Sequence, residues 1–277
     1  NGMPQTALCL RQISEDLAVP LPNTSKGLYC DFDNCGLPKP KNFFWAQEVQ
    51  PRAKDIMDGM LWVHRNLDPM PYSLETLDFN VQWGRIPTTF QLYLQALTPV
   101  HVLTGAYEKT LDPAYLDYAQ KLIRSWVAYF SDPAKTAKNK FVYGDHAVAL
   151  RGENLMYFGQ VCSKAGILSD ELRGYLSHLL KQHGDWLNDD SHYTKRHNHG
   201  IMQDQALLHL GFVLGRRDWV EHAKERLLLQ EQWAFNAEMV HTENSPGYAD
   251  IVADMFQSIG AFLSHNQDPM GEKLQDD

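Results

Sequence analysis

The feature that most constrains the fold is a series of helix-length segments, each with one apolar face, that fills the chain after about residue 45. Their apolar residues recur at intervals of three and four, which places them on one side of an α-helix. The predicted helices are 47–66, 88–106, 113–130, 145–165, 168–187, 200–215, 218–236 and 246–264. No run of alternating β-branched residues is long enough for a large sheet. The sequence therefore predicts an all-α protein.

Helix-capping residues support several of these boundaries. Asp112 before Pro113 is a typical helix start, and so is Ser245 before Pro246. Short connections between helices of similar length favour antiparallel neighbours. Because no strict repeat of 34 or 40 residues occurs, two architectures fit equally: an open solenoid of helix pairs, and helix pairs closed into an (α/α) toroid.

The first 45 residues differ from the rest, because they are rich in proline, glycine and asparagine. We predict an irregular N-terminal arm at 1–45 and a helical domain at 46–277. Four cysteines are too few for a disulfide scaffold in a chain of 277 residues. Cys30 and Cys35 flank a turn-rich stretch, and they are either bridged or free thiols.

The formal net charge of −9, from 34 acidic and 25 basic residues, argues against a nucleic-acid partner. It does not exclude an anionic polysaccharide, because a local basic cleft can form in an acidic protein. Residues 191–199 are the segment richest in potential cations.

No apolar run reaches membrane-spanning length. The first residues lack signal-peptide features, so the protein is either not secreted or has had its signal removed.

The first candidate site is Arg-His-Asn-His-Gly at 196–200. Gly200 is expected to let the chain turn sharply into a helix, which places Asn198 and His199 just ahead of the helix N-terminus. Free amide groups there favour negative charge, and an amide beside an imidazole can hold a carboxylate and accept a proton. The alternative, favoured for an isolated pair, is that Asn198 caps the helix and His199 is a surface neighbour.

The second candidate site lies at 243–248, where Ser245 and Pro246 predict a helix start and place Tyr248 in its first turn. The positive end of the helix dipole eases ionisation of a phenol whose ordinary pKa is about 10. Such a tyrosine can donate or accept a proton. For Tyr248 alone, packing of a half-buried ring is the favoured alternative.

Two further segments contain candidate substrate contacts. Arg151 and Asn154 lie three residues apart on one predicted helix face, and arginine suits carboxylate or sulfate recognition. The commoner fate of such an arginine is an internal ion pair. Trp83 and Arg85 occupy a loop before a helix, where the tryptophan is about as suited to stacking on a sugar as to filling a core.

A metal site is a less favoured hypothesis. His192, His197 and His199 lie close together, and the His-x-His spacing suits zinc. There is no HExxH motif, and histidines in a polar loop more often have no metal. We therefore predict no cofactor.

Taken together, these segments resemble the heparinase II/III and related alginate lyase group. The resemblance is carried by Asn-His-Gly at 198–200, Ser-Pro-Gly-Tyr at 245–248 and Asp-His-Ala-x-Ala-Leu-Arg at 145–151. Their order agrees, and so does the spacing of 49 residues from His199 to Tyr248 (248 − 199).

The resemblance implies an incomplete (α/α)6 toroid that binds an acidic polysaccharide across a long groove and cleaves it by β-elimination at a uronic acid. Asn198 would hold the carboxylate, His199 would act as the base or share that role, and Tyr248 would act as the acid, or as acid and base. The expected substrate contacts are Trp83, Arg85, Tyr143, His146, Arg151, Asn154, Arg196 and Glu243.

The chain departs from the family pattern in two places. Members usually add a C-terminal β-sandwich domain, and this chain stops at Asp277 without one, so we expect a fragment or a lone toroid domain. Members often have histidine after the matched tyrosine, where this chain has Ala249. The substrate class implies a periplasmic or secreted protein.

Three other functions remain open. Hydrolysis on an (α/α) toroid would use two carboxylates, with Asp145, Asp204 or Glu243 as candidates. Uronate epimerisation would share the proton abstraction but leave the polymer intact. A non-catalytic carbohydrate-binding domain would bind the polymer with no activity for a Tyr248 substitution to remove.

Overall fold

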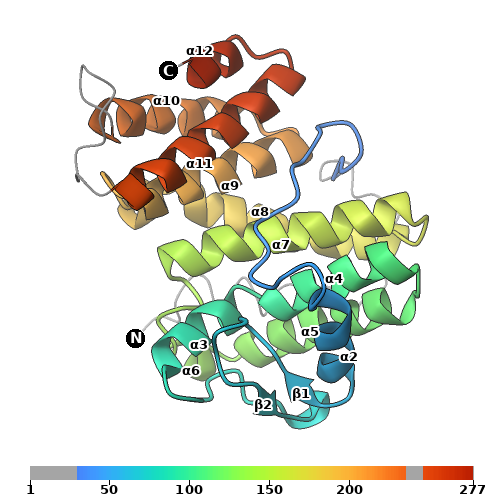
Figure 1. The fold of residues 1–277 in the computed structure, drawn as a ribbon. Helices are drawn as coiled ribbons and strands as arrows, with labels where there is room; N and C mark the ends of the chain where they lie inside the picture. The colour runs from blue at the N-terminus through green and yellow to red at the C-terminus, as the bar shows by residue number, and fades with distance from the viewer. Residues whose placement is uncertain (1–29, 235–245, 277) are drawn as a thin grey trace.

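The computed structural model describes residues 30–234 and 246–276, and within them it confirms an all-α protein (Figure 1). The α-helices are α2 (Val49–Met57), α3 (Pro87–Gln95), α4 (Thr98–Thr110), α5 (Ala114–Phe130), α6 (Pro133–Thr136), α7 (Asp145–Lys164), α8 (Asp170–Asn188), α9 (Asn198–Val213), α10 (Arg217–Ala234), α11 (Pro246–His265) and α12 (Met270–Asp276). Two 3₁₀ turns, η1 (Leu74–Thr76) and η2 (Asp190–His192), and a short antiparallel pair, β1 (Met60–Leu61) with β2 (Met70–Pro71), complete the described elements.

Consecutive helices pack as pairs, α4 with α5, α7 with α8, α9 with α10 and α11 with α12. In Figure 1, α2 to α6 lie on one side of α7, and α9 to α12 lie on the other side. This arrangement agrees with the predicted antiparallel pairs. No helix in the described part of the chain has the length and apolarity to cross a membrane.

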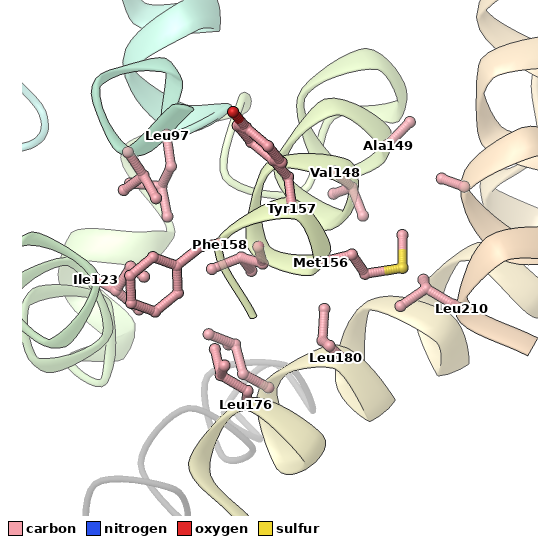
Figure 2. Close-up of a cluster of buried hydrophobic side chains, with 14 of the residues drawn as sticks. Leu97, Ile123, Val148, Ala149, Met156, Tyr157, Phe158, Leu176, Leu180 and Leu210 are labelled. Carbon is pink, nitrogen blue, oxygen red and sulfur yellow. The ribbon is translucent and has the colours of Figure 1, made fainter. Parts of the chain in front are cut away.

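Helix α7 lies at the centre of the core. Fifteen of its 20 residues are buried, so it is covered around most of its circumference. Figure 2 shows Met156 and Phe158 of α7 among Ile123 of α5, Leu180 of α8 and Leu210 of α9. Since burying one such side chain stabilises a fold by about 1.5–3 kcal/mol, α7 is the main connection between the two halves.

The predicted helix 88–106 is two helices, α3 and α4, which corrects the prediction. Leu97 between them has a left-handed backbone (φ 54°), and Pro99 is the second residue of α4. Proline has no N–H to donate to the carbonyl four residues earlier, which is that of Gln95. Arg151 of α7 donates from Nη1 to that carbonyl at 2.7 Å, and Asn154 donates from Nδ2 to Ala96 O at 2.9 Å.

The predicted helix 47–66 is also shorter than expected, because α2 ends at Met57. Gly59 has φ 93°, a conformation that side-chain-bearing residues rarely adopt, and there the chain turns into β1. The apolar residues that suggested a longer helix, such as Leu61 and Val63, follow this turn instead, and their side chains are buried in the core.

The described part of the N-terminal arm is irregular, as predicted, and it contacts helices from both halves. Asp31 N–H donates to Val213 O of α9 at 2.8 Å, and Lys39 Nζ donates to Glu108 Oε2 of α4 at 2.6 Å. Cys30 and Cys35 are buried free thiols, so the hypothesis of a bridge between them is wrong.

Candidate active site

The candidate site lies at the N-terminus of α9. Asn198 and His199 are the first two residues of this helix, rather than just ahead of it as predicted. The capping residue is His197, whose Nδ1 accepts the backbone N–H of His199 at 3.1 Å. The alternative that Asn198 is the cap is therefore wrong. His199 is held at a helix terminus where the dipole favours negative charge.

A carboxylate from the N-terminus of α7 holds the His199 ring. Asp145 Oδ2 lies 3.1 Å from His199 Nδ1 and accepts the Thr194 hydroxyl at 2.6 Å, and Asp145 Oδ1 accepts the backbone N–H of His146 at 2.7 Å. The bond from His199, followed by those from Thr194 and His146, keeps the pKa of Asp145 well below its usual range. An ionised carboxylate at Nδ1 favours the tautomer protonated there, and this leaves the Nε2 lone pair of His199 as a base.

Two more imidazoles surround His199. The His146 ring centroid lies 4.6 Å from that of His199, and the His197 centroid lies 4.4 Å from it. Burial, together with the charge of a protonated His199, lowers the pKa of His146 to about 4. His146 is therefore neutral near pH 7, and its ring adds hydrogen-bonding capacity without adding positive charge.

Asn198 provides an unsatisfied polar group beside these rings. Its Oδ1 is buried and has no hydrogen-bond partner among the described residues. A buried carbonyl oxygen without a partner costs about 1–3 kcal/mol and calls for an explanation. A bound ligand that reaches this amide would supply one.

Side chains from α9 and α10 fix the loop that carries Thr194 and His197. Gln203 accepts the Thr194 N–H at 2.9 Å, and Asp204 Oδ2 accepts the Tyr193 hydroxyl at 2.6 Å. Gln230 Nε2 donates to the same Tyr193 hydroxyl at 2.7 Å. Because the loop is held from both helices, Thr194 is presented to Asp145 in one position.

Gly200 is required for a reason other than the predicted sharp turn. It lies in the first turn of α9, and a Cβ built on it would stand 2.1 Å from Thr194 O and 2.3 Å from Gln230 Nε2. The loop carrying Thr194 thus approaches the helix too closely for any other residue.

We expect Gly200→Ala to destabilise the fold by about 1–3 kcal/mol, because the backbone of Thr194 must move to admit the methyl group. Chemical denaturation measures this change, and Gly152→Ala in α7 is the matched control. A Cβ at Gly152 meets only Leu210 Cδ1 at 3.8 Å, so helix propensity should make that change neutral or stabilising by up to about 1 kcal/mol. Equal stabilities for the two variants would contradict the close approach.

Tyr248 lies in the first turn of α11, as predicted. Its side chain is outside what the structure describes, and Glu243 is outside the described residues altogether. Helix α11 packs against α9, the helix that begins with Asn198 and His199.

Comparison with known proteins shows the family of the chain. The family model for alginate lyase matches residues 84–270, which is more than half of the chain and includes α7, α9 and α11. The chain belongs to the alginate lyase family. No curated protein matches the sequence.

Solved structures show how this alginate lyase family member folds. A heparinase III with methylated lysines superposes with a TM-score of 0.70 at 13% identity, over 88% of this chain and 41% of that one. The heparan sulfate lyase HepC from Pedobacter heparinus superposes with a TM-score of 0.62 at 17% identity, over 96% and 41%. The described helices therefore form an incomplete helical toroid, which confirms the predicted fold class. The chain spans about two fifths of the length of these structures.

Arg151 and Asn154 of this alginate lyase family member are built into the core. Arg151 is 1% exposed and donates to Gln95 O, Val142 O and His183 Nε2, each at 2.7 Å. Asn154 is 3% exposed, and its amide bonds Ala96 O and His101. Because these groups are already used inside the fold, we do not carry the predicted substrate contacts of Arg151 and Asn154 into the proposed site.

The remaining predicted contacts lie at separate places. Arg85 is exposed and pairs with Asp68, and Trp83 donates from Nε1 to Pro69 O at 3.1 Å. The Tyr143 ring lies 6.5 Å from that of Trp186. Arg196 directly precedes His197 and has a left-handed backbone (φ 56°), which is uncommon for a residue other than glycine.

The histidines that suggested a zinc site have other contacts. His192 stacks on Trp186, with ring centroids 4.4 Å apart, and its Nδ1 lies 3.0 Å from Trp186 O. His197 uses Nδ1 as the cap of α9. Within residues 30–234 and 246–276, no group of three or more His, Cys, Asp or Glu side chains is arranged to hold a metal ion.

Sequence reasoning missed the partners of His199. Asp145 appeared only as part of a matched segment and as a candidate for hydrolysis, and Thr194 was not singled out. The Asp145–His199 contact joins residues 54 apart on different helices, so spacing along the chain gave no signal for it. The Thr194 hydroxyl reaches Asp145 only because the loop packs against the start of α7.

Proposed function

We propose that this chain is the helical domain of a polysaccharide lyase that cleaves a uronic-acid-containing polysaccharide by β-elimination. The observation that carries the proposal is the Asp145–His199 pair at the N-terminus of α9. It combines an oriented base with a terminus that favours an anion. Membership of the alginate lyase family supports the reaction class. Because such polymers lie outside the cytoplasm, we place the activity in the periplasm or outside the cell.

The chemistry requires three functions around one sugar. The C5 proton of a uronate is weakly acidic, because the electrons it leaves behind can be spread over the carboxylate. As His199 Nε2 takes this proton, the C5–H electrons form the C4–C5 double bond, and the C4–O glycosidic bond breaks. The departing oxygen must then receive a proton, and we assign that step to Tyr248.

The two residues at the start of α9 divide the remaining work. The Asn198 amide and the backbone amides at the helix terminus would hold the sugar carboxylate and reduce the cost of its growing negative charge. Asp145 and Thr194 keep the His199 ring turned toward the substrate. Proton transfer by a placed group typically contributes a factor of about 10²–10⁴, and stabilising the developing charge contributes a comparable or larger one.

Hydrolysis is less well supported by the carboxylates that the structure describes. Asp204 is fully buried and bonded to Tyr193, so it cannot reach a glycosidic bond without rearrangement. Asp145 accepts three hydrogen bonds that keep its pKa low, which is unsuitable for a general acid.

The test is ultraviolet absorbance during incubation with alginate and heparan sulfate, comparing wild type with Tyr248→Phe. We expect absorbance from the unsaturated product to rise in the wild type, and to rise at least 100-fold more slowly in the variant, because phenylalanine cannot protonate the leaving oxygen. New reducing ends without absorbance would indicate hydrolysis. An intact polymer with exchanged C5 protons would indicate epimerisation, and binding without either change would indicate a carbohydrate-binding domain.

A further inference from the structure

We propose that His197 is a positioning residue for the candidate base, and that it holds the first turn of α9 only while its imidazole is neutral. This role rests on the proposed function for its effect on the rate, whereas the state of the ring can be measured without turnover. The observations behind it are the two bonds from His197 to α9, the hydrogen-bonding states of an imidazole and the charges around the ring.

His197 is bonded twice to the first turn of α9. Its carbonyl oxygen accepts the Gly200 N–H at 2.9 Å, and its Nδ1 accepts the His199 N–H at 3.1 Å. The backbone of His197 is extended (φ −155°, ψ 149°), which is the usual conformation of a capping residue. Because Asp145 contacts the ring of His199 and His197 binds its backbone, the candidate base is held at both ends.

Histidine is an unusual residue for such a cap. Serine, threonine, aspartate and asparagine are preferred, because each offers a side-chain oxygen as acceptor. A neutral imidazole accepts at one nitrogen, whereas a protonated imidazole donates at both. The bond from the His199 N–H to His197 Nδ1 therefore requires a neutral ring with its proton on Nε2. An ordinary histidine side chain changes charge between about pH 5 and 8, so we expect mild acid to abolish this cap.

The groups of α7 and α9 that surround His197 include one acid. The His197 ring centroid lies 4.4 Å from that of His199, and His146 lies 4.6 Å from His199. The acid is Asp145, whose two oxygens already accept three hydrogen bonds. In acid, His199 becomes the cation that Asp145 pairs with. A proton on His197 would then lie beside that cation without an acid of its own.

The loop and the N-terminal arm contribute further cations. Lys195 and Arg196 directly precede His197. Burial is the main cause that lowers the pKa of His146, and the charges of His197 and Lys41 contribute to it. Lys41 of the arm therefore belongs to the same surroundings.

Helix α10 has acidic groups near this loop, but they are not bonded to the ring. Asp190 and Glu225 line the groove that the loop shares with α10, and Asp190 Oδ1 pairs with Arg226 at 2.6 Å. Among the residues that the structure describes, no side chain of α10 or α11 forms a hydrogen bond or ion pair with His197. A protonated His197 thus has no acidic partner in the described part of the chain.

Loss of the cap would act directly on the base. The first turn of α9 would keep the bond to the His197 carbonyl but lose the bond that fixes the His199 backbone. A positive charge at this terminus would also be opposed by the helix dipole. We therefore expect acid to reduce the rate in two ways, by protonating His199 and by releasing the turn that carries it.

The first experiment measures kcat on the preferred polymer from pH 8 to pH 5.5 in wild type, His197→Asn and His197→Ala. Asparagine caps at every pH in this range and alanine at none, and neither residue carries a charge. We expect the alanine variant to be about three- to tenfold slower than the asparagine variant throughout, the factor that one cap contributes. Wild type should match His197→Asn at pH 8 and approach His197→Ala at pH 5.5, with smaller changes in KM.

Two results would overturn the proposal. One is equal rates for His197→Asn and His197→Ala, which would leave the cap a contribution to stability alone. The other is a constant ratio of wild type to His197→Asn across the pH range, which would show that the charge of the ring does not matter. His178→Asn is the control for loss of a histidine, because that ring bonds only Gly174 O of its own helix.

The second experiment needs no polymer, so it separates this role from the proposed function. Nuclear magnetic resonance of the free protein reports the protonation of each His197 ring nitrogen and the exchange of the His199 amide proton. We expect a bare Nδ1 at pH 8, and loss of about three- to tenfold in amide protection as the ring becomes charged, but not in His197→Asn. A proton on Nδ1 at pH 8, or protection that persists on a charged ring, would refute the cap even if no polymer is cleaved.

Discussion

Replacing His199 with alanine is expected to lower the rate of elimination about 10²–10⁴-fold, because the variant loses the group that removes the C5 proton. The fold should change little, since His199 is only half-buried and the cap of α9 is His197. The measurement is the initial rate of absorbance increase on the preferred polymer at saturating concentration. We expect the change in kcat to exceed the change in KM.

Asp145→Asn tests whether the carboxylate orients that base. Asparagine has the same shape, but it carries no charge and can present an N–H to His199 Nδ1, which would favour the wrong tautomer. We expect a large loss of kcat with a folded protein. His178→Ala is the control, because that ring bonds only Gly174 O of its own helix. Wild-type rates in both Asp145→Asn and His199→Ala would refute the proposed base.

Arg151→Leu is expected to destabilise the protein by about 3–5 kcal/mol. The guanidinium donates to two backbone carbonyls and to His183, and it lies over Trp126 with its central carbon 4.4 Å from the ring centroid. Burial lowers its pKa to about 10, so it remains protonated at neutral pH. Leucine would leave the carbonyl oxygens of Gln95 and Val142 buried without donors, at about 1–3 kcal/mol for each.

Denaturation by urea at neutral pH measures this loss. Arg85→Leu is the matched control, because Arg85 has an 82% exposed side chain and makes one surface ion pair, which should contribute about 1 kcal/mol or less. Equal stabilities of Arg151→Leu and Arg85→Leu would show that the bond from Arg151 to the Gln95 carbonyl, at the break between α3 and α4, does not stabilise the fold.

Much of the helix pattern could be predicted from the sequence, because burial on one face leaves a periodic signal. Helices α5, α7, α8 and α11 begin and end within about two residues of the prediction. The errors arose where the backbone departs from helix while the apolar periodicity continues. Pro99 was a local signal for the break after α3, and Gly59 was one for the end of α2.

The candidate site was only partly predictable. Asn198, His199 and the position of Tyr248 were found from motifs next to helix starts. The groups that orient His199 were not found, because Asp145 and Thr194 meet it only when α7, α9 and the preceding loop pack together. The contacts of Arg151 were missed for a related reason. It donates to His183 and to two backbone carbonyls that lie far from it along the chain or carry no sequence signal.

Helix α7 is about 30 Å long, and hydrogen bonds partway along it fix its position. Arg151 and Asn154 anchor it to the broken helix beside it, and Asp145 is its first residue. A slip of α7 by one residue would move that carboxylate by about 1.5 Å and rotate it by about 100° away from His199. Pro99 leaves the carbonyl of Gln95 free to accept from Arg151. The break between α3 and α4 therefore helps to fix the axial position of α7, and with it the position of Asp145 beside His199.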